Sequence, residues 1–159
     1  MDALTAVSVR LADPEDPGVR PLIMAHLAHG RDATVQSSDH TLDIQALKGP
    51  GIRFWIVSDA GTVVGCGALK NLPDGMAEVK SVHIADAARG RGLARQLMDH
   101  MITTARRDGI EGLVLETGTM GQYKAARGLY EALGFTCCGP IHGYTPDPNS
   151  AFMRLPLST

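Results

Sequence analysis

The sequence predicts an α/β (α+β) fold over residues 1–159, in which strands and helices alternate around a mixed β-sheet. Three observations predict it. A chain of 159 residues is long enough for one hydrophobic core. Short β-type runs are interleaved with segments whose apolar residues recur at helical spacing. Because no internal repeat, low-complexity tract or long linker divides these segments, we expect them to form a single domain.

The N-terminal third of the chain predicts one strand and two helices. Residues 7–11 alternate as a strand, and residues 13–17 are rich in Asp and Pro, which form turns and cap helices. Apolar residues at helical spacing then predict a helix through residues 19–27. Residues 41–47 predict a second, brief helix, because the Gly-Pro-Gly run at 49–51 ends it.

The middle of the chain predicts a β-hairpin and a third strand. Residues 54–57 and 63–69 are rich in β-branched and apolar side chains on either side of a short turn, and the turn at 71–75 precedes a strand over 76–84. Regular alternation would place Val79, Ser81 and His83 on one face of this strand, and Glu78, Lys80, Val82 and Ile84 on the other. Neither face is purely polar, which indicates a central strand.

The C-terminal half predicts two amphipathic helices between short strands. The helices are expected at residues 93–107, with a basic last turn, and at 122–133, where Gly134 ends the pattern. Strands are expected at residues 113–115, 135–138 and 151–157.

Composition excludes several function classes. A net charge of −2 with 4% aromatic residues argues against a nucleic-acid-binding protein. No apolar run approaches the ~20 residues that span a bilayer, and no leader pattern is found, so we expect a cytoplasmic protein with no membrane partner. Cys66, Cys137 and Cys138 fit neither a disulfide framework nor a zinc site, so we expect reduced thiols and no metal. A nucleophilic role for one of them is the weaker alternative.

The run from Arg89 to Ala94 predicts an anion-binding loop, because it joins a strand to the start of a long helix. Glycines allow close approach of the backbone, the first N–H groups of a helix have no intrahelical acceptor, and the helix dipole favours negative charge there. Arg89 and Arg91 add donors that match phosphate oxygens. A helix that merely begins with glycines and surface arginines is the open alternative. The P-loop and dinucleotide-binding patterns are both absent from the sequence.

Two motifs carry a resemblance to a known family. Arg89, Gly92 and Ala94 fit the pattern R/Q x x G x G/A, and residues 126–135 fit A x x x Y x x x G F. Together, in this order, they resemble the GNAT superfamily of N-acyltransferases, in particular a small bacterial subgroup. The resemblance implies a central mixed, mostly antiparallel sheet of six to seven strands flanked by about four helices. It also implies acetyl-CoA as the cosubstrate.

The resemblance also implies which residues bind the cosubstrate. Backbone groups of the strand would hold the pantetheine arm, and one N–H near Val82 could stabilise the negative charge that develops on the thioester oxygen. Plain β pairing of this strand is the alternative. Family members often have Pro at the position of Asp86 and Asn at the position of Tyr123. The implied cosubstrate-binding residues are Val82, His83, Ile84, Arg89, Gly90, Arg91, Gly92, Leu93, Ala94, Tyr123 and Ala126.

Two residues are implied to be catalytic. Tyr130 would protonate the departing thiolate, although it shares a helical face with apolar residues and could be an ordinary core aromatic. Glu78 would take the proton of the amine, which is mostly protonated at neutral pH; the alternative is an exposed charge on a strand end. His83 titrates in a suitable range, but alternation places it on the opposite face, so it is the weaker candidate.

The acceptor is expected to bind at polar loops that include His40, Glu116 and Tyr144, which could also be ordinary surface residues. The sequence thus predicts an N-acetyltransferase that transfers an acetyl group from acetyl-CoA to a primary amine of a small molecule or amino acid, by direct attack in a ternary complex. A noncatalytic acyl-CoA-binding sensor is the alternative. A homodimer is possible, and the sequence does not identify the acceptor.

Overall fold

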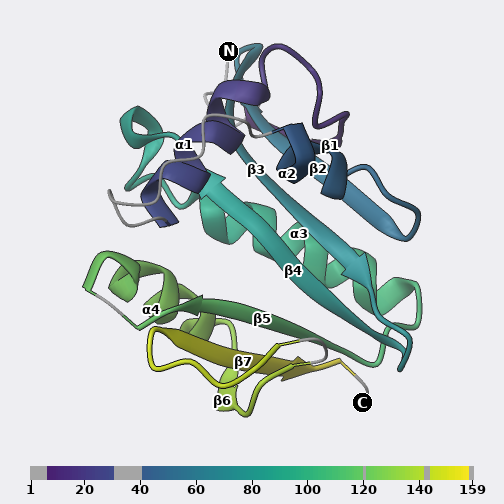
Figure 1. Ribbon diagram of the computed structural model, residues 1–159. Helices are drawn as coiled ribbons and strands as arrows, with labels where there is room; N and C mark the ends of the chain where they lie inside the picture. The colour runs from purple at the N-terminus through teal and green to yellow at the C-terminus, as the bar shows by residue number, and fades with distance from the viewer. Residues whose placement is uncertain (1–6, 31–40, 120, 142–143, 158–159) are drawn as a thin grey trace. The chain divides into compact units, whose positions relative to one another are not determined.

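The computed structural model describes residues 7–30, 41–119, 121–141 and 144–157 (Figure 1). Its seven strands form one sheet in the order β1-β2-β3-β4-β5-β7-β6. β4 pairs with β5 in parallel, whereas β1 with β2, β5 with β7 and β6 with β7 pair antiparallel. The predicted mixed, mostly antiparallel sheet with four α-helices is therefore confirmed. By internal contacts the chain divides into a first unit, residues 1–69 and 81–100, and a second unit, residues 70–80 and 101–159.

The first unit is a sheet with helices on both faces. Its β1 pairs antiparallel with β2, from Val7↔Asp59 to Leu11↔Trp55. Figure 1 shows α1 and α2 over one face of β2 and β3, with α3 behind the other face. Val19, Ile23, Ile44 and Ile56 belong to its buried core. The elements that lie wholly or partly in this unit are β1 (Val7–Leu11), α1 (Arg20–Gly30), α2 (Thr41–Ala46), β2 (Ile52–Asp59), β3 (Thr62–Asn71), β4 (Met76–Ile84) and α3 (Leu93–Arg107).

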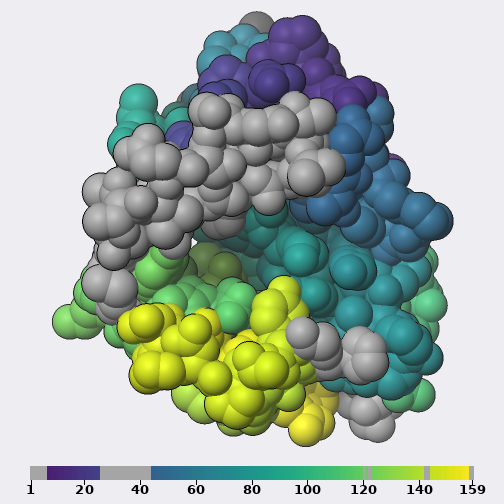
Figure 2. Space-filling model, viewed as in Figure 1, coloured from purple at the N-terminus to yellow at the C-terminus, as the bar shows by residue number. Residues whose placement is uncertain are grey.

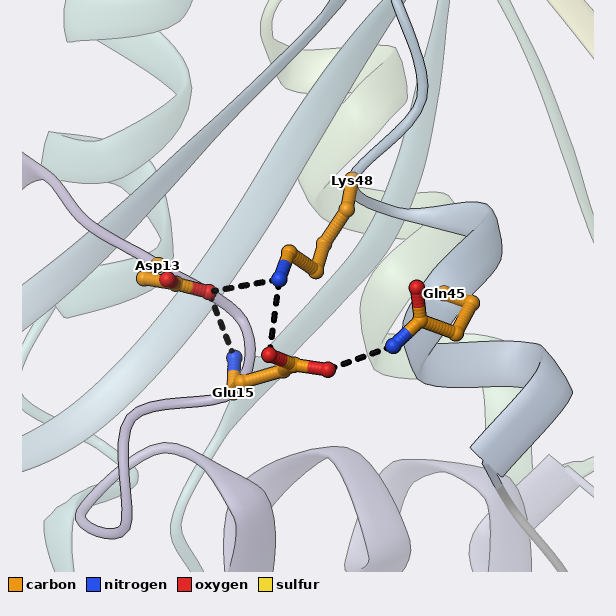
Figure 3. A network of polar contacts seen from close by, with 4 residues as sticks. All are labelled: Asp13, Glu15, Gln45 and Lys48. Carbon is orange, nitrogen blue, oxygen red and sulfur yellow. Dashed lines mark hydrogen bonds and ion pairs between the residues drawn. The ribbon is translucent and has the colours of Figure 1, made fainter.

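A polar network joins the turn after β1 to the end of α2 (Figure 3). The Lys48 ammonium lies 2.7 Å from Glu15 Oε2 and 4.0 Å from Asp13 Oδ1. Gln45 donates a hydrogen bond to the other Glu15 oxygen, and Asp13 Oδ1 accepts from the Glu15 N–H at 2.9 Å. The hydrogen bond to Glu15 raises the pKa of Lys48. Since the network is exposed, its main effect is to fix the turn against α2.

β4 carries an irregularity at Ser81. This residue has a φ of +58°, in the left-handed region that a residue with a Cβ rarely adopts. The Cys66 thiol donates to the Ser81 carbonyl at 3.4 Å, and burial raises the pKa of Cys66 to about 12. The strict alternation predicted for residues 76–84 is therefore wrong beyond Lys80, because the left-handed residue breaks the period of two. The argument that set His83 opposite Glu78 fails with it.

The second unit places β5 between two strands. β5 (Gly112–Gly118) pairs with the start of β4 over Met76↔Gly112 to Val79↔Leu115, and on its other side with β7 (Ser150–Pro156). β6 (Thr136–Cys138) pairs with β7, and α4 (Lys124–Ala132) follows a 3-10 turn, η3 (Gly121–Tyr123). In Figure 2 the yellow C-terminal segments form much of the surface of this unit on the face drawn.

Two of the element ends that differ from the sequence-based expectations lie near Gly118. The strand predicted over 113–115 extends to Gly118, and the helix predicted from residue 122 begins as the 3-10 turn η3. Both shifts meet at Gly118, where a Cβ would lie 2.0 Å from the Tyr123 ring. The ring can pack on β5 only because Gly118 has no side chain. No helix in the described ranges is long and apolar enough to cross a bilayer.

Candidate functional site

The loop before α3 holds its arginine side chains within the first unit. After η2 (Asp86–Ala88), Arg89 donates from Nε to the Ile84 carbonyl at 3.1 Å and pairs through Nη1 with Asp86 Oδ1 at 3.0 Å. Arg91 pairs with Asp59 Oδ2 at 2.7 Å. These guanidinium groups, predicted as phosphate donors, are partly exposed and pair with carboxylates of the same unit. Asp86 is the carboxylate partner of Arg89.

The backbone of the same loop is open to a ligand. Gly90 and Gly92 have φ values of +81° and +75°, and a Cβ at either would meet no atom within 4 Å. Among the described residues, no backbone carbonyl accepts from the N–H groups of Gly90, Arg91 or Gly92. The N-terminus of α3 follows directly, so its dipole adds to these donors. The loop therefore suits an anion held by the main chain, whereas the Leu93 side chain is buried.

Glu78 is the central polar group of the second unit. Its carboxylate is 5% exposed, accepts a hydrogen bond from the Tyr144 hydroxyl at 2.7 Å, and lies 3.8 Å from the Lys80 ammonium. Burial, followed by the bond to Glu78, raises the pKa of Tyr144 well above its ordinary value, so the phenol stays a donor. The alternative that Glu78 is an exposed strand-end charge is wrong.

Glu78 and Tyr144 line a pocket of about 460 Å³ in this unit. A volume of this size falls in the range of about 300–1,000 Å³ typical of small-molecule sites. Glu78 and Tyr144 were predicted from the sequence, whereas Lys70 and Asn71, which end β3 and also line the pocket, were not. The only signal was Lys70 directly before the predicted turn at 71–75, and a lysine beside a turn is also common on plain surfaces. The lining residues are Lys70, Asn71, Leu72, Pro73, Glu78, Lys80 and Tyr144.

Tyr130 is a buried phenol on α4. Its side chain is 7% exposed and its ring centroid lies 5.7 Å from that of Phe135. Burial raises its pKa to about 12. Within the described part of the chain, the hydroxyl has no hydrogen-bond partner, although buried polar groups normally have one.

The other residues that were predicted to bind the acceptor or the cosubstrate lie in several parts of the fold. Glu116 accepts from Ser150 Oγ at 2.6 Å, and its charge contributes to the raised pKa of Tyr144, so the two predicted acceptor residues lie in one electrostatic environment. Tyr123 packs on Gly118, as described above. His83 and Ile84 are buried, and Val82, Ala94 and Ala126 are partly so. His40 lies outside the described residues. In those residues no three His, Cys, Asp or Glu side chains are grouped to hold a metal ion.

Comparison with known proteins gives concordant matches. The profile of the acetyltransferase (GNAT) family matches residues 22–135. The uncharacterized N-acetyltransferase YsnE of Bacillus subtilis is 37% identical, over 94% of this chain and 99% of its own length. An IAA acetyltransferase of Azospirillum brasilense is 43% identical, over 76% of this chain and 78% of its own. A GCN5-related N-acetyltransferase structure from Kribbella flavida has a TM-score of 0.75 and 27% identity, covering 96% of this chain and 99% of that one.

Proposed function

Because the chain belongs to the GNAT acetyltransferase family and is an acyltransferase, we propose that it transfers an acetyl group from acetyl-CoA to a primary amine. In this proposal the acceptor is a small molecule or amino acid that attacks the thioester directly, with both substrates bound. The proposal assigns the roles that the reaction requires to residues in each unit. It treats residues 1–159 as one catalytic domain.

In this proposal the first unit binds the cosubstrate. The main-chain N–H groups from Gly90 to Gly92 and the start of α3 bind the pyrophosphate of CoA. The backbone of β4 near Val82 holds the pantetheine arm and offers an N–H to the thioester oxygen, where negative charge builds during attack. The left-handed φ of Ser81 supports this role, because a residue in that conformation departs from regular strand geometry just before Val82. In the described register, pairing of β4 with β5 ends at Val79.

The second unit supplies the acid and the base. An alkyl ammonium has a pKa near ~10, so a bound amine must lose a proton before it attacks. Glu78 accepts that proton, directly or through water, while Tyr144 fixes the orientation of its carboxylate. Tyr130 donates its proton to the leaving sulfur. A phenol with a pKa of about 12 stays protonated at neutral pH and is ready to donate.

One observation carries the proposal: a buried Tyr130 hydroxyl without a partner among the described residues, in the second of two family motifs. An unpaired buried O–H is unfavourable by about 1–3 kcal/mol unless a ligand atom accepts from it. The sulfur of a bound thioester would be that acceptor.

The test combines binding and turnover. Calorimetry with CoA measures the cosubstrate site, and a panel of amines, amino acids and peptides is incubated with acetyl-CoA while free thiol and acetylated product are measured. We expect CoA binding together with thiol release for at least one acceptor class. Tight CoA binding without turnover across the panel would instead favour an acyl-CoA sensor. No CoA binding at all would overturn both.

A further inference from the structure

We propose that the pocket beside Glu78 selects acceptors that carry a carboxylate next to the reacting amine, and that Lys70 binds this carboxylate. The inference deepens the proposed function and rests on it in one respect: the acceptor binds with its amine toward Glu78. The substrate class is therefore an amino acid or another small amino-carboxylate. It follows from the charges in the pocket, the rigidity of its walls and its volume.

The pocket carries an unbalanced positive charge. Lys70 and Lys80 contribute two ammonium groups and Glu78 one carboxylate. The Glu78 charge is already matched, since Lys80 lies 3.8 Å from it. In the described part of the chain no carboxylate lies within ion-pair distance of Lys70. A ligand that balances the pocket must bring one negative charge, and the Asn71 amide beside Lys70 can donate a further hydrogen bond to it.

The Glu78 carboxylate, which lines the same pocket, suits a cation. Glu78 is nearly buried, and one of its oxygens accepts from Tyr144. An amine that enters loses much of its hydration, and the carboxylate is the acceptor able to replace it. Because a carboxylate has about four acceptor positions, it can bind the amine while Tyr144 remains bonded. The pocket therefore offers a group of opposite charge to each charge of a zwitterion.

The walls that hold these groups are fixed. In the turn after β3, the Leu72 N–H donates to the Met76 carbonyl at 2.9 Å, and Asp74 Oδ1 accepts from the Met76 N–H at 3.1 Å. The Tyr144 ring, which also lines the pocket, lies 5.8 Å from the Phe152 ring, in a cluster that also contains Leu72. Groups that are held in place lose little conformational freedom when a ligand binds. The positions of the charges in the pocket can therefore decide which acceptors bind.

The experiment compares acceptors that differ only in the carboxylate. Each of the standard amino acids is paired with its carboxamide, and KM and kcat are measured with saturating acetyl-CoA for the native chain, Lys70→Met, Lys70→Arg and Lys124→Met. Lys124 is an exposed lysine on α4, so its loss removes the same charge from the second unit outside the pocket. Direct binding of each pair is measured by calorimetry as well.

We expect the native chain to favour amino acids over carboxamides, and Lys70→Met to raise KM for the amino acids roughly tenfold with little change in kcat. Lys70→Arg should restore most of the preference, and Lys124→Met should leave it intact. Turnover without a preference for the carboxylate, or a preference that survives Lys70→Met, overturns the inference and leaves the proposed function standing.

Calorimetry keeps the two proposals distinguishable if no acceptor is turned over. Amino-acid binding that Lys70→Met abolishes would support the carboxylate site even though the proposed function had failed. Equal binding of amino acids and carboxamides, or binding of neither, would overturn the site.

Discussion

The loop at Arg89–Gly92 offers main-chain groups to a ligand, whereas the pocket around Glu78 offers side chains. In the loop, the guanidinium groups of Arg89 and Arg91 contact Ile84, Asp86 and Asp59, and the N–H groups of the main chain are left for a ligand. In the pocket, side chains line the cavity, and the main-chain bonds of the turn from Leu72 to Met76 hold its wall.

This difference bears on where specificity lies. A main-chain site depends on φ angles that glycine permits, so it is tied to one ligand class and to a short motif. A side-chain site can change its ligand by exchanging one residue while the fold stays the same. We therefore expect substitutions in the loop to affect cosubstrate binding alone, and substitutions in the pocket to affect acceptor chemistry and choice.

The largest effect is expected for Glu78→Gln. The amide keeps the shape but cannot take a proton, so kcat/KM should fall roughly 10²–10⁴-fold, the range of general-base catalysis. CoA affinity by calorimetry should stay within about twofold. Glu131→Gln removes an exposed carboxylate from the same unit and serves as the control. Full activity of Glu78→Gln would show that another group, or water alone, accepts the proton.

Tyr130→Phe should come next, with kcat reduced roughly 10²-fold and CoA affinity unchanged, because only the proton donor is removed. The free energy of unfolding should stay equal or rise slightly, since the hydroxyl that is lost has no partner among the described residues. With a pKa of about 12 the native phenol remains protonated up to pH 10, so Tyr130 should produce no fall in kcat between pH 7 and 10. Equal losses in kcat and CoA affinity would contradict the acid role.

A smaller effect is expected from a pair of glycine substitutions. Gly92→Ala forces a side chain into a φ of +75°, which is unfavourable by roughly 1–2 kcal/mol, and should weaken CoA binding about tenfold. Gly128→Ala lies in the exposed interior of α4, where a Cβ meets nothing within 4 Å, and should raise the free energy of unfolding by about 0.5–1 kcal/mol. Chemical denaturation and calorimetry measure both. Similar behaviour of the two variants would mean that the loop conformation has no part in binding.

The smallest effect is expected for Asp59→Asn. The Arg91 and Asp59 side chains are 46% and 25% exposed, and ion pairs of this kind contribute at most about 1 kcal/mol. CoA affinity should change less than about threefold and depend slightly on ionic strength. A tenfold or greater loss of affinity would show that Arg91 must be held in place for binding, and would weaken the contrast between the loop and the pocket.

Much of the fold could be predicted because its signals are local. Helical spacing identified α3, and β-type runs beside turn residues identified the hairpin of β2 and β3. The left-handed conformation of Ser81 left no such signal, because the surrounding sequence has the pattern of a regular strand. The extension of β5 to Gly118 depends on its pairing with β7, far along the chain, and periodicity cannot show this.

In the candidate site, too, local features could be predicted from the sequence and contacts between distant residues could not. The loop was predicted from Gly90 and Gly92, whose positive φ angles are a local main-chain requirement. The ion pair of Arg91 was not predicted, because Asp59 lies 32 residues away in the sequence. Lys70 was not predicted as a site residue, because nothing in the local sequence distinguishes it from other exposed lysines. Only the fold places it in one pocket with Glu78 and with Tyr144, which is 66 residues from Glu78 in the sequence.

The reactivity of the buried Cys66 thiol can be used to measure local unfolding of the chain. Maleimides react with thiolates, so a buried thiol with a pKa of about 12 is protected while the first unit is closed. Cys137 is exposed and reacts first, and Cys138 is intermediate in exposure. Counting attached labels by mass against time would therefore give the opening rate around β3 without any substitution.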